Sequence, residues 1–230
     1  DACVSAGNTG ALMALSKIIL KTIPGIDRPA ICGSLPTKSG QFHMLDLGAN
    51  VECNAKHLYQ FSLMGSALVQ SLELNNKPVI GLLNIGSEEF KGNDTIKAAG
   101  QLISKSNLNY AGFVEGDDMF SGKFDVVVAD GFAGNIALKS IEGVAKVISH
   151  FIKTEFTKNI FTKLSALISL PVLKSVKQRV DPREYNGASL VGLQGVVVKS
   201  HGGADSYAFS KAINTAYYEV KNELLNKIES

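Results

Sequence analysis

The sequence has few cysteines, no paired metal-ligand motif and little net charge, and each shortage argues against a class of protein. Its three cysteines, Cys3, Cys32 and Cys53, are widely spaced without a CxxC pair, which disfavours a disulfide framework or a zinc site. The four histidines show no HExxH or similar spacing, so we expect no metal and no cofactor. A net charge of +2 with 45% hydrophobic residues indicates a globular chain, with no sign of a nucleic-acid partner.

Long hydrophobic runs are also absent. No stretch of about 18 uncharged apolar residues could cross a bilayer, and no basic segment precedes a short apolar core as in a signal peptide. We therefore expect a cytoplasmic protein. The first residues, DACVSAG, contain no Met and already resemble a strand, so we expect an N-terminal portion of the native protein to precede them.

One unit repeats along the chain: a short apolar run, a Gly-rich polar turn, and a stretch with helical periodicity. Apolar strands that alternate with helices predict a largely parallel sheet covered on both faces, that is, an α/β fold of three layers, α/β/α. Four such units begin with an apolar run and its turn. These segments are HMLDLGAN (43–50), PVIGLLNIGSEEFKGND (78–94), FDVVVADGFAGN (124–135) and GVVVKSHGGAD (195–205).

Residues 151–185 interrupt this pattern. They read as two amphipathic helices joined near Pro171, inserted into one domain that spans 1–230. Seven lysines and arginines against three acidic residues give the segment a local charge of +4. Two interpretations remain open: a solvated helix pair that packs on the body or a second subunit, or a surface for anionic lipid or an acidic protein. The residues we assign to such a surface are Lys163, Lys174, Lys177 and Arg179.

The stretch SAGNTG (5–10) before the apolar run ALMAL has the form of an anion site. A helix N-terminus offers unpaired N–H groups, and glycines allow the backbone to approach an anion closely. It matches neither the P-loop nor the dinucleotide fingerprint, and GDDMFSGKF (116–124) has the wrong spacing for a P-loop. No GxSxG nucleophile motif occurs. Each such loop could also be a plain turn between a strand and a helix.

Other polar residues fall in the predicted turns, and in a parallel sheet these turns would converge on one crevice. Asp130 ends a very apolar strand, where its carboxylate would either cap the next helix or orient a substrate. His201 is either structural or a proton carrier near neutral pH. The remaining members of the set are Asp46, Asn50, Asn135, Lys199 and Asp205.

The motifs VSAGNTGALMA, DLGAN, NIGSEEFKGN, VEGDDMFSGKFDVVVADGFAGNIALKS and NGASLVGLQGVVVKSHGGAD follow one another over nearly the whole chain. In this order they resemble the phosphate acyltransferase family of bacterial phospholipid synthesis. The resemblance implies transfer of a fatty acyl group from acyl carrier protein to inorganic phosphate. The acyl phosphate would then pass to a membrane acyltransferase that acylates glycerol 3-phosphate.

The resemblance also implies a homodimer, a fold related to phosphotransacetylases and to isocitrate and isopropylmalate dehydrogenases, and association with the inner face of the membrane. It implies about a hundred further residues before the present start. Acyl transfer to phosphate needs an anion cradle, oxyanion donors and help for a leaving thiolate. By residue type and position we assign catalysis to Asn135, Lys199 and His201, and phosphate or substrate binding to Ser5, Gly7, Asn8, Thr9, Gly10, Asp46, Asn50, Asp130, Gly131 and Gly134.

Two other functions fit part of this pattern. A short-chain phosphotransacylase using acyl-coenzyme A would share the anion loops. A catalytically silent scaffold that gathers lipid-synthesis enzymes at the membrane would need only binding surfaces such as that of the predicted helix pair. A dehydrogenase is disfavoured by the missing dinucleotide loop.

Overall fold

The computed structural model describes residues 1–72 and 75–229, with the side chains of Lys177 and Val180 outside the description. Its described residues form a central sheet of eight strands. These strands are β1 (Ala2–Ser5), β2 (Ala30–Pro36), β3 (Gln41–Leu45), β4 (Val79–Leu83), β5 (Asn109–Val114), β6 (Val126–Val128), β7 (Ala188–Val191) and β8 (Val196–Lys199).

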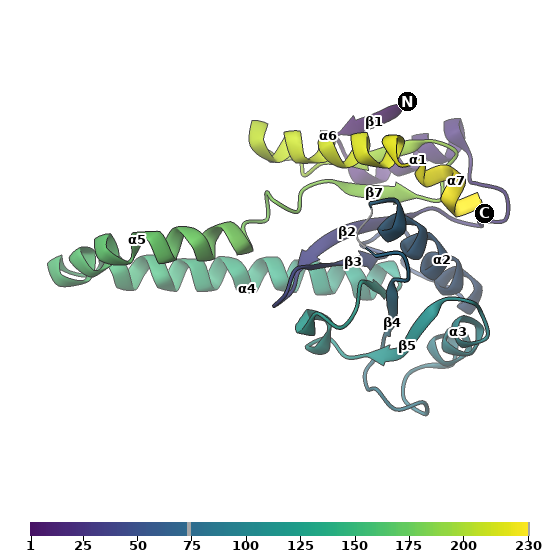
Figure 1. Cartoon of the computed structure of the whole chain (residues 1–230), viewed down its shortest axis with the longest axis horizontal. Coiled ribbons are helices and arrows are strands. Elements are labelled where there is room, and N and C mark those ends of the chain that lie inside the picture. Colours follow the sequence, from purple (N-terminus) through teal and green to yellow (C-terminus); the bar gives the residue numbers. More distant parts are fainter. Residues whose placement is uncertain (73–74, 230) are drawn as a thin grey trace.

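Helices cover both faces of the sheet, so the three-layer α/β/α prediction is confirmed (Figure 1). One face packs against α2, α3, α6 and α7, and the other against α1, the short helix η1 and the first turns of α4. The bounds are α1 (Thr9–Leu20), α2 (Ala55–Ser71), α3 (Asp94–Ser104), η1 (Asp118–Ser121), α4 (Gly131–Thr157), α5 (Ile160–Val180), α6 (Ser206–Lys221) and α7 (Leu224–Glu229).

Successive side chains along each strand point to opposite faces of the sheet and so contribute to the cores on the two faces. In β2, Cys32 faces the α2 side while Ile31 and Leu35 face the α4 side. In β8, Val197 faces α1, and its neighbours Val196 and Val198 pack on α6. Because both faces are covered, each strand is apolar on both sides, as the continuous apolar runs predict.

The strand order is β1-β8-β7-β2-β3-β6-β4-β5. Four pairings are parallel, and the three that involve β7 or join β2 to β3 are antiparallel. Strands β1, β8 and β2 therefore run one way and the other five run the opposite way. The expectation that all predicted loops meet in one crevice is wrong, because the carboxyl ends of the two sets lie at opposite edges of the sheet.

A hairpin formed by α4 and α5 projects away from the sheet (Figure 1). The predicted helix pair is present, but its boundary differs from the prediction. The two helices meet at Lys158 and Asn159, and Pro171 lies inside α5. Asn159 starts α5 because its side chain accepts hydrogen bonds from the amides of Phe161 and Thr162, both at 3.0 Å.

The last helical stretch is divided as well. Helix α6 ends at Lys221, Glu223 has a φ of 55°, and α7 begins at Leu224. A positive φ at a non-glycine residue interrupts the helical path, so the apolar periodicity from Phe209 to Ile228 spans two helices.

Candidate active site

Two of the predicted loops lie side by side where strands β1 and β8 end. We call this end of the strands edge A and the opposite end edge B. Both loops follow the adjacent parallel strands β1 and β8, in which Ser5 pairs with Lys199. The amide of Ser200 donates to the carbonyl of Ser5 at 2.8 Å, which extends the pairing into the loops. The structure thus brings SAGNTG and KSHGGAD together from positions almost 200 residues apart in the sequence.

The first of these loops opens into the N-terminus of α1. The side chain of Asn8 accepts from the amide of Ala11 at 2.9 Å and caps the helix. The amides of Thr9 and Gly10 have no acceptor within an α-helix because they belong to its first turn. Gly7, Asn8, Thr9 and Gly10 are all exposed, so this positive helix end faces solvent, as an anion site requires.

The second loop holds His201 in a defined orientation. The amide of Gly203 donates to Nδ1 of His201 at 3.0 Å, so the neutral ring carries its proton on Nε2. His201 is exposed at the edge of the sheet, where Nε2–H can reach a ligand.

Asn186, which precedes β7, fixes this loop. Its side-chain oxygen accepts from the amide of His201 at 2.9 Å, and its amide donates to Oγ of Ser200 at 2.9 Å and to the carbonyl of Ala208 at 2.7 Å. Asn186 is a site residue that was not predicted from the sequence. Its motif NGASL was visible, but the contact depends on the antiparallel pairing of β7 with β8, which no local pattern revealed.

Charged groups border the same loop. Arg183 bonds to Asp181 at 2.7 Å and to Asp205 at 2.9 Å, and Asp205 caps α6 by accepting from the amide of Ala208. That amide, followed by Arg183, lowers the pKa of Asp205. Lys199 is only 9% exposed and donates to the carbonyl of Ser200, and desolvation lowers its pKa.

The other predicted residues lie at edge B, where β3 and β6 end. Asp46 is completely buried. Its carboxylate accepts from the amides of Ile31 and Ala49, both at 3.0 Å, and from the backbone and side-chain amides of Asn50 at 2.6 and 2.9 Å. These donors satisfy the carboxylate, so Asp46 organises the DLGAN loop.

The glycines of DGFAGN allow close packing at edge B. A Cβ on Gly131 would lie 2.7 Å from the carbonyl oxygen of Asn50, and one on Gly134 would collide with the backbone of Asp46. Asp130 caps α4 by accepting from the amide of Ala133 at 2.7 Å, the first of the two roles expected for it. Asn135 is exposed beside Gly48 and lies apart from His201.

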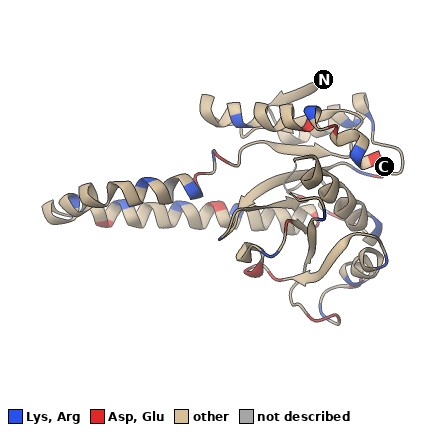
Figure 2. Cartoon of the chain, viewed as in Figure 1, with Lys and Arg blue, Asp and Glu red and all other residues tan. Residues whose placement is uncertain are grey.

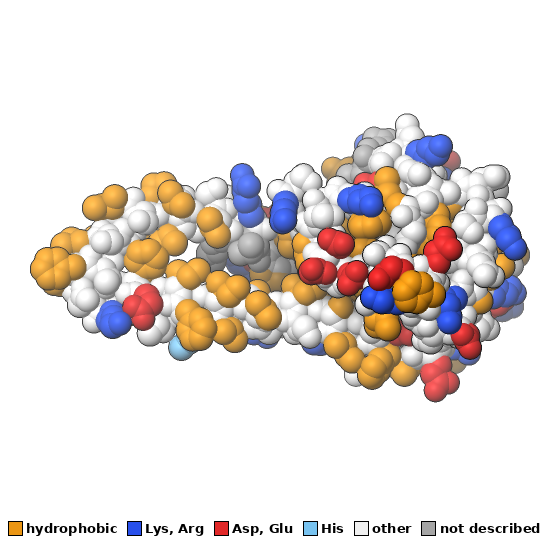
Figure 3. All heavy atoms as spheres, turned by 90° about the horizontal axis from the view of Figure 1, so that it is seen from below, with side chains coloured by type: hydrophobic (Ala, Val, Ile, Leu, Met, Phe, Trp, Pro, Cys, Tyr) orange, Lys and Arg blue, Asp and Glu red, His pale blue; other side chains and the backbone are white. Residues whose placement is uncertain are grey.

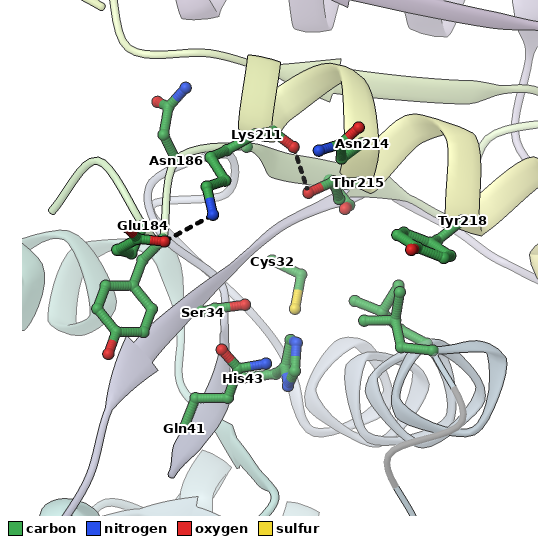
Figure 4. A pocket seen from close by; sticks show the side chains of 15 residues that line it. Cys32, Ser34, Gln41, His43, Glu184, Asn186, Lys211, Asn214, Thr215 and Tyr218 are labelled. Atoms are coloured by element: carbon green, nitrogen blue, oxygen red, sulfur yellow. Dashed lines mark hydrogen bonds and ion pairs between the residues drawn. The ribbon is translucent and has the colours of Figure 1, made fainter. Parts of the chain in front are cut away.

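A groove borders edge A on the face of the sheet between α2 and α6. The cavity measures about 370 Å³ and has β2, β3 and β7 as its floor (Figure 4). Asn186 lies at one end of it and Tyr218 toward the other (Figure 4). The side chains of Cys32, Ser34 and His43 point into the groove from the sheet, and Asn186 links the groove to the His201 loop by accepting from the His201 amide.

The hairpin combines exposed apolar and basic side chains. Phe161 is 77% exposed and Ile168 is 83% exposed. Figure 3 shows many hydrophobic side chains on the surface of the hairpin. Lys163, Lys174 and Arg179 are exposed, and the side chain of Lys177 lies outside the described residues. Figure 2 shows several Lys and Arg positions along α5. Among the described residues, no helix is long and apolar enough to cross a membrane, and no cluster of His, Cys, Asp and Glu could hold a metal ion.

The sequence matches the family model described as fatty acid synthesis protein over residues 1–227. The phosphate acyltransferase of Methylococcus capsulatus is 58% identical over 228 residues, which are 99% of this chain and 67% of that protein. The phosphate acyltransferase of Nitrosococcus oceani is 56% identical over 230 residues, 100% of this chain and 68% of that protein. The chain therefore spans about two thirds of the length of these relatives.

Solved structures share the fold at low identity. A phosphotransacetylase from Streptococcus pyogenes superposes with a TM-score of 0.65 at 18% identity, over 96% of this chain and 63% of that one. A 4-hydroxythreonine-4-phosphate dehydrogenase from Klebsiella pneumoniae gives a TM-score of 0.56 at 12% identity, over 94% and 64%. These similarities support the predicted relation to phosphotransacylase and dehydrogenase-like folds.

Proposed function

Because the chain belongs to the fatty acid synthesis protein family, and within it to the phosphate acyltransferases, we propose that it transfers a fatty acyl group from acyl carrier protein to inorganic phosphate. The acyl phosphate formed would serve phospholipid synthesis through a membrane glycerol-3-phosphate acyltransferase. The observation that carries the proposal is the meeting of the α1 N-terminus with the His201 loop at edge A, since it joins an anion cradle to a positioned hydrogen-bond donor.

The reaction balances with these groups. An oxygen of hydrogen phosphate attacks the thioester carbonyl carbon, the new C–O bond forms and the C–S bond breaks. The phosphate gives up one proton to water and the leaving thiolate takes one from water. Nε2–H of His201 is placed to donate a hydrogen bond to the oxyanion that forms on the carbonyl oxygen, and the exposed amides of α1 with the side chains of Asn8 and Thr9 hold the phosphate. Lys199 adds positive charge beside them.

This assignment places the chemistry at edge A and gives the edge B residues a supporting role. Asp46, Asn50, Asp130, Gly131 and Gly134 hold one another in the DLGAN and DGFAGN loops. Asn135 lies with them, so its proposed function as an oxyanion donor depends on a ligand reaching edge B.

The direct test is phosphate-dependent release of acyl carrier protein from long-chain acyl carrier protein by this chain. His201→Gln should lower turnover at least ~100-fold, as expected for loss of a positioned oxyanion donor. Gln101→Ala, at an exposed position on α3 outside the site and the hairpin, is the control and should leave turnover unchanged. Equal activity of both variants would contradict the role of His201.

The same assay separates the alternatives. Faster turnover of short-chain acyl-coenzyme A than of acyl carrier protein would favour the phosphotransacylase. A scaffold would turn over neither, and phosphate would not raise its melting temperature, whereas a phosphate site present only in the folded chain would.

The hairpin supplies the proposed contacts with the membrane surface or acidic acyl carrier protein. Its exposed lysines and arginine attract anionic partners, and apolar side chains such as Phe161 favour a less aqueous environment. An apolar helix pair also suits a second copy of the chain, in agreement with the proposed homodimer. Sedimentation of the chain with and without anionic vesicles tests both contacts.

A further inference from the structure

The described residues that form the floor of the groove beside edge A include no cation. His43 is 3% exposed, and burial lowers its pKa to about 4, so the ring is neutral near pH 7. Burial raises the pKa of the Cys32 thiol, which therefore stays protonated. Ser189 donates a hydrogen bond to the buried carboxyl of Glu219 on α6, and burial raises the pKa of that carboxyl to about 7. The floor therefore offers hydrogen bonds but no cation, which suits a neutral polar ligand better than an anion.

The walls continue this pattern. Near Asn186 the lining includes the Glu184–Lys211 ion pair, the hydroxyl of Ser34 and the amide of Gln41, and α6 also contributes Asn214 and Thr215 (Figure 4). An alkyl chain lying there would remove these groups from water without offering partners, which costs free energy. The apolar part, formed by Leu68, Leu72 and Tyr218, is confined to the side of α2 and the last turns of α6.

The cation among the described residues that line the groove, Lys211, is already paired. Lys211 bonds to Glu184 at 2.6 Å, and Tyr207 also donates to Glu184. A neutral ligand can enter without breaking this pair.

Length narrows the choice of ligand. On α6 the lining runs from Lys211 to Tyr218, where seven residues of helix span about 10 Å, and beyond Lys211 it continues to Glu184 and Asn186. A pantetheine arm has a chain of about twelve atoms, comparable to four extended residues or roughly 13 Å. It carries two amides, a hydroxyl and a dimethyl group, which match the polar lining and the apolar end.

We propose that this groove binds the pantetheine arm of the acyl donor, with its sulfur toward Asn186 and its dimethyl end between Leu72 and Tyr218. The inference rests on the proposed acyl transfer to phosphate. It holds for acyl carrier protein and for coenzyme A alike, because both present the acyl group on this arm.

Kinetics with two donors test the proposal. Ser34→Leu fills the groove, and Asn214→Leu removes a hydrogen-bonding amide. Each should lower kcat/KM for acyl-coenzyme A at least ~10-fold, the equivalent of about 1.4 kcal/mol. Each should change kcat/KM for the N-acetylcysteamine thioester, which lacks most of the arm, less than twofold. Ser210→Ala, on α6 outside the groove, is the control and should leave both values unchanged.

A binding measurement separates this inference from the reaction itself. Calorimetric titration with pantetheine should show binding to the unaltered chain, and Ser34→Leu and Asn214→Leu should each weaken it at least tenfold, even if no donor is turned over. Thermal melts establish that both variants are folded. Absence of pantetheine binding to the unaltered chain, or equal kinetic losses with both donors, would overturn the proposal.

Discussion

The side-chain oxygen of Asn186 accepts the backbone N–H of His201 at 2.9 Å, although 15 residues separate them in sequence. The same side chain donates to Ser200 and Ala208. One asparagine therefore fixes the His201 loop relative to β7 and the start of α6. Its position explains how an exposed histidine keeps a defined place at the edge of the sheet.

Asn186→Ala should reduce turnover roughly 10- to 100-fold, because misplacing a catalytic group by about 1 Å has effects of this size. The phosphate KM should change little, since the α1 N-terminus remains intact. Asn84→Ala removes a comparable bond, from Asn84 to the carbonyl of Lys91 at 3.1 Å in another loop, and is the control. Steady-state kinetics on both variants check this prediction, and equal effects would contradict it.

Asn8→Ala should combine a stability loss with a binding loss. Removing the cap of α1 should cost about 1 kcal/mol, and the variant should also bind phosphate more weakly. Asn93→Ala removes the equivalent cap of α3, where Asn93 accepts from Ile96 at 2.8 Å. Both variants should unfold at lower urea concentration, while only Asn8→Ala should lose phosphate protection against heating. Equal phosphate protection in both would remove Asn8 from the phosphate site.

For Asn135, at edge B, we predict only a small effect on turnover. The sequence analysis assigned Asn135 to oxyanion binding, for which loss of a donor costs ~100- to 1000-fold in rate. Its place beside Gly48, apart from the His201 loop, leads us to expect less than a threefold change in turnover for Asn135→Ala. A loss near the larger figure would show that the reacting groups lie at edge B.

Some features of the fold were predictable from the sequence and others were not. The alternation of apolar strands, Gly-rich turns and helices predicted the layered fold, and the apolar and basic periodicity predicted the hairpin. Strand direction was not predictable, because β7 and the β2–β3 pair reverse the sheet through long-range pairing. For that reason SAGNTG and KSHGGAD were correctly grouped with each other but wrongly grouped with DLGAN and DGFAGN.

Glycine illustrates the same limit within one motif. Gly131 and Gly134 resemble an anion loop in sequence, yet the space beside them is occupied by backbone atoms of Asn50 and Asp46. Gly202 lies next to the carbonyl oxygen of Ala6 at edge A, with 3.5 Å for an added Cβ. Only the fold distinguishes a glycine needed for packing from one in an exposed loop.

The hairpin should lose affinity for anionic surfaces when its charge is reversed. Lys163→Glu together with Lys174→Glu changes two exposed positions on α5. We expect weaker binding to anionic vesicles or to acyl carrier protein, and a smaller dependence of that binding on salt. Lys77→Glu together with Lys105→Glu, at two exposed positions outside the hairpin, changes the net charge equally and is the control. Unchanged binding in both assays would favour packing as the only role of the helix pair.

The last prediction concerns the buried carboxyl of Glu219, which is 1% exposed and bonded to Ser189. Burial raises its pKa from 4.5 to about 7, so the folded chain binds an extra proton across this range. Stability from this group is therefore fully present at low pH and decreases as pH rises from 4.5 to 7. His43 acts in the opposite sense, because burial lowers its pKa from 6.5 to about 4 and stability is lost as pH falls through that range.

The two effects cancel between about pH 4.5 and 6.5, where one group binds a proton on folding and the other releases one. Glu219→Gln removes one side of this balance and keeps a partner for Ser189. The stability of this variant relative to the unaltered chain should rise by about 1.4 kcal/mol per pH unit, roughly 3 kcal/mol in total from pH 4.5 to 7. Urea unfolding of both chains at a series of pH values measures the difference. A difference independent of pH would mean that Glu219 titrates alike in the folded and unfolded chain.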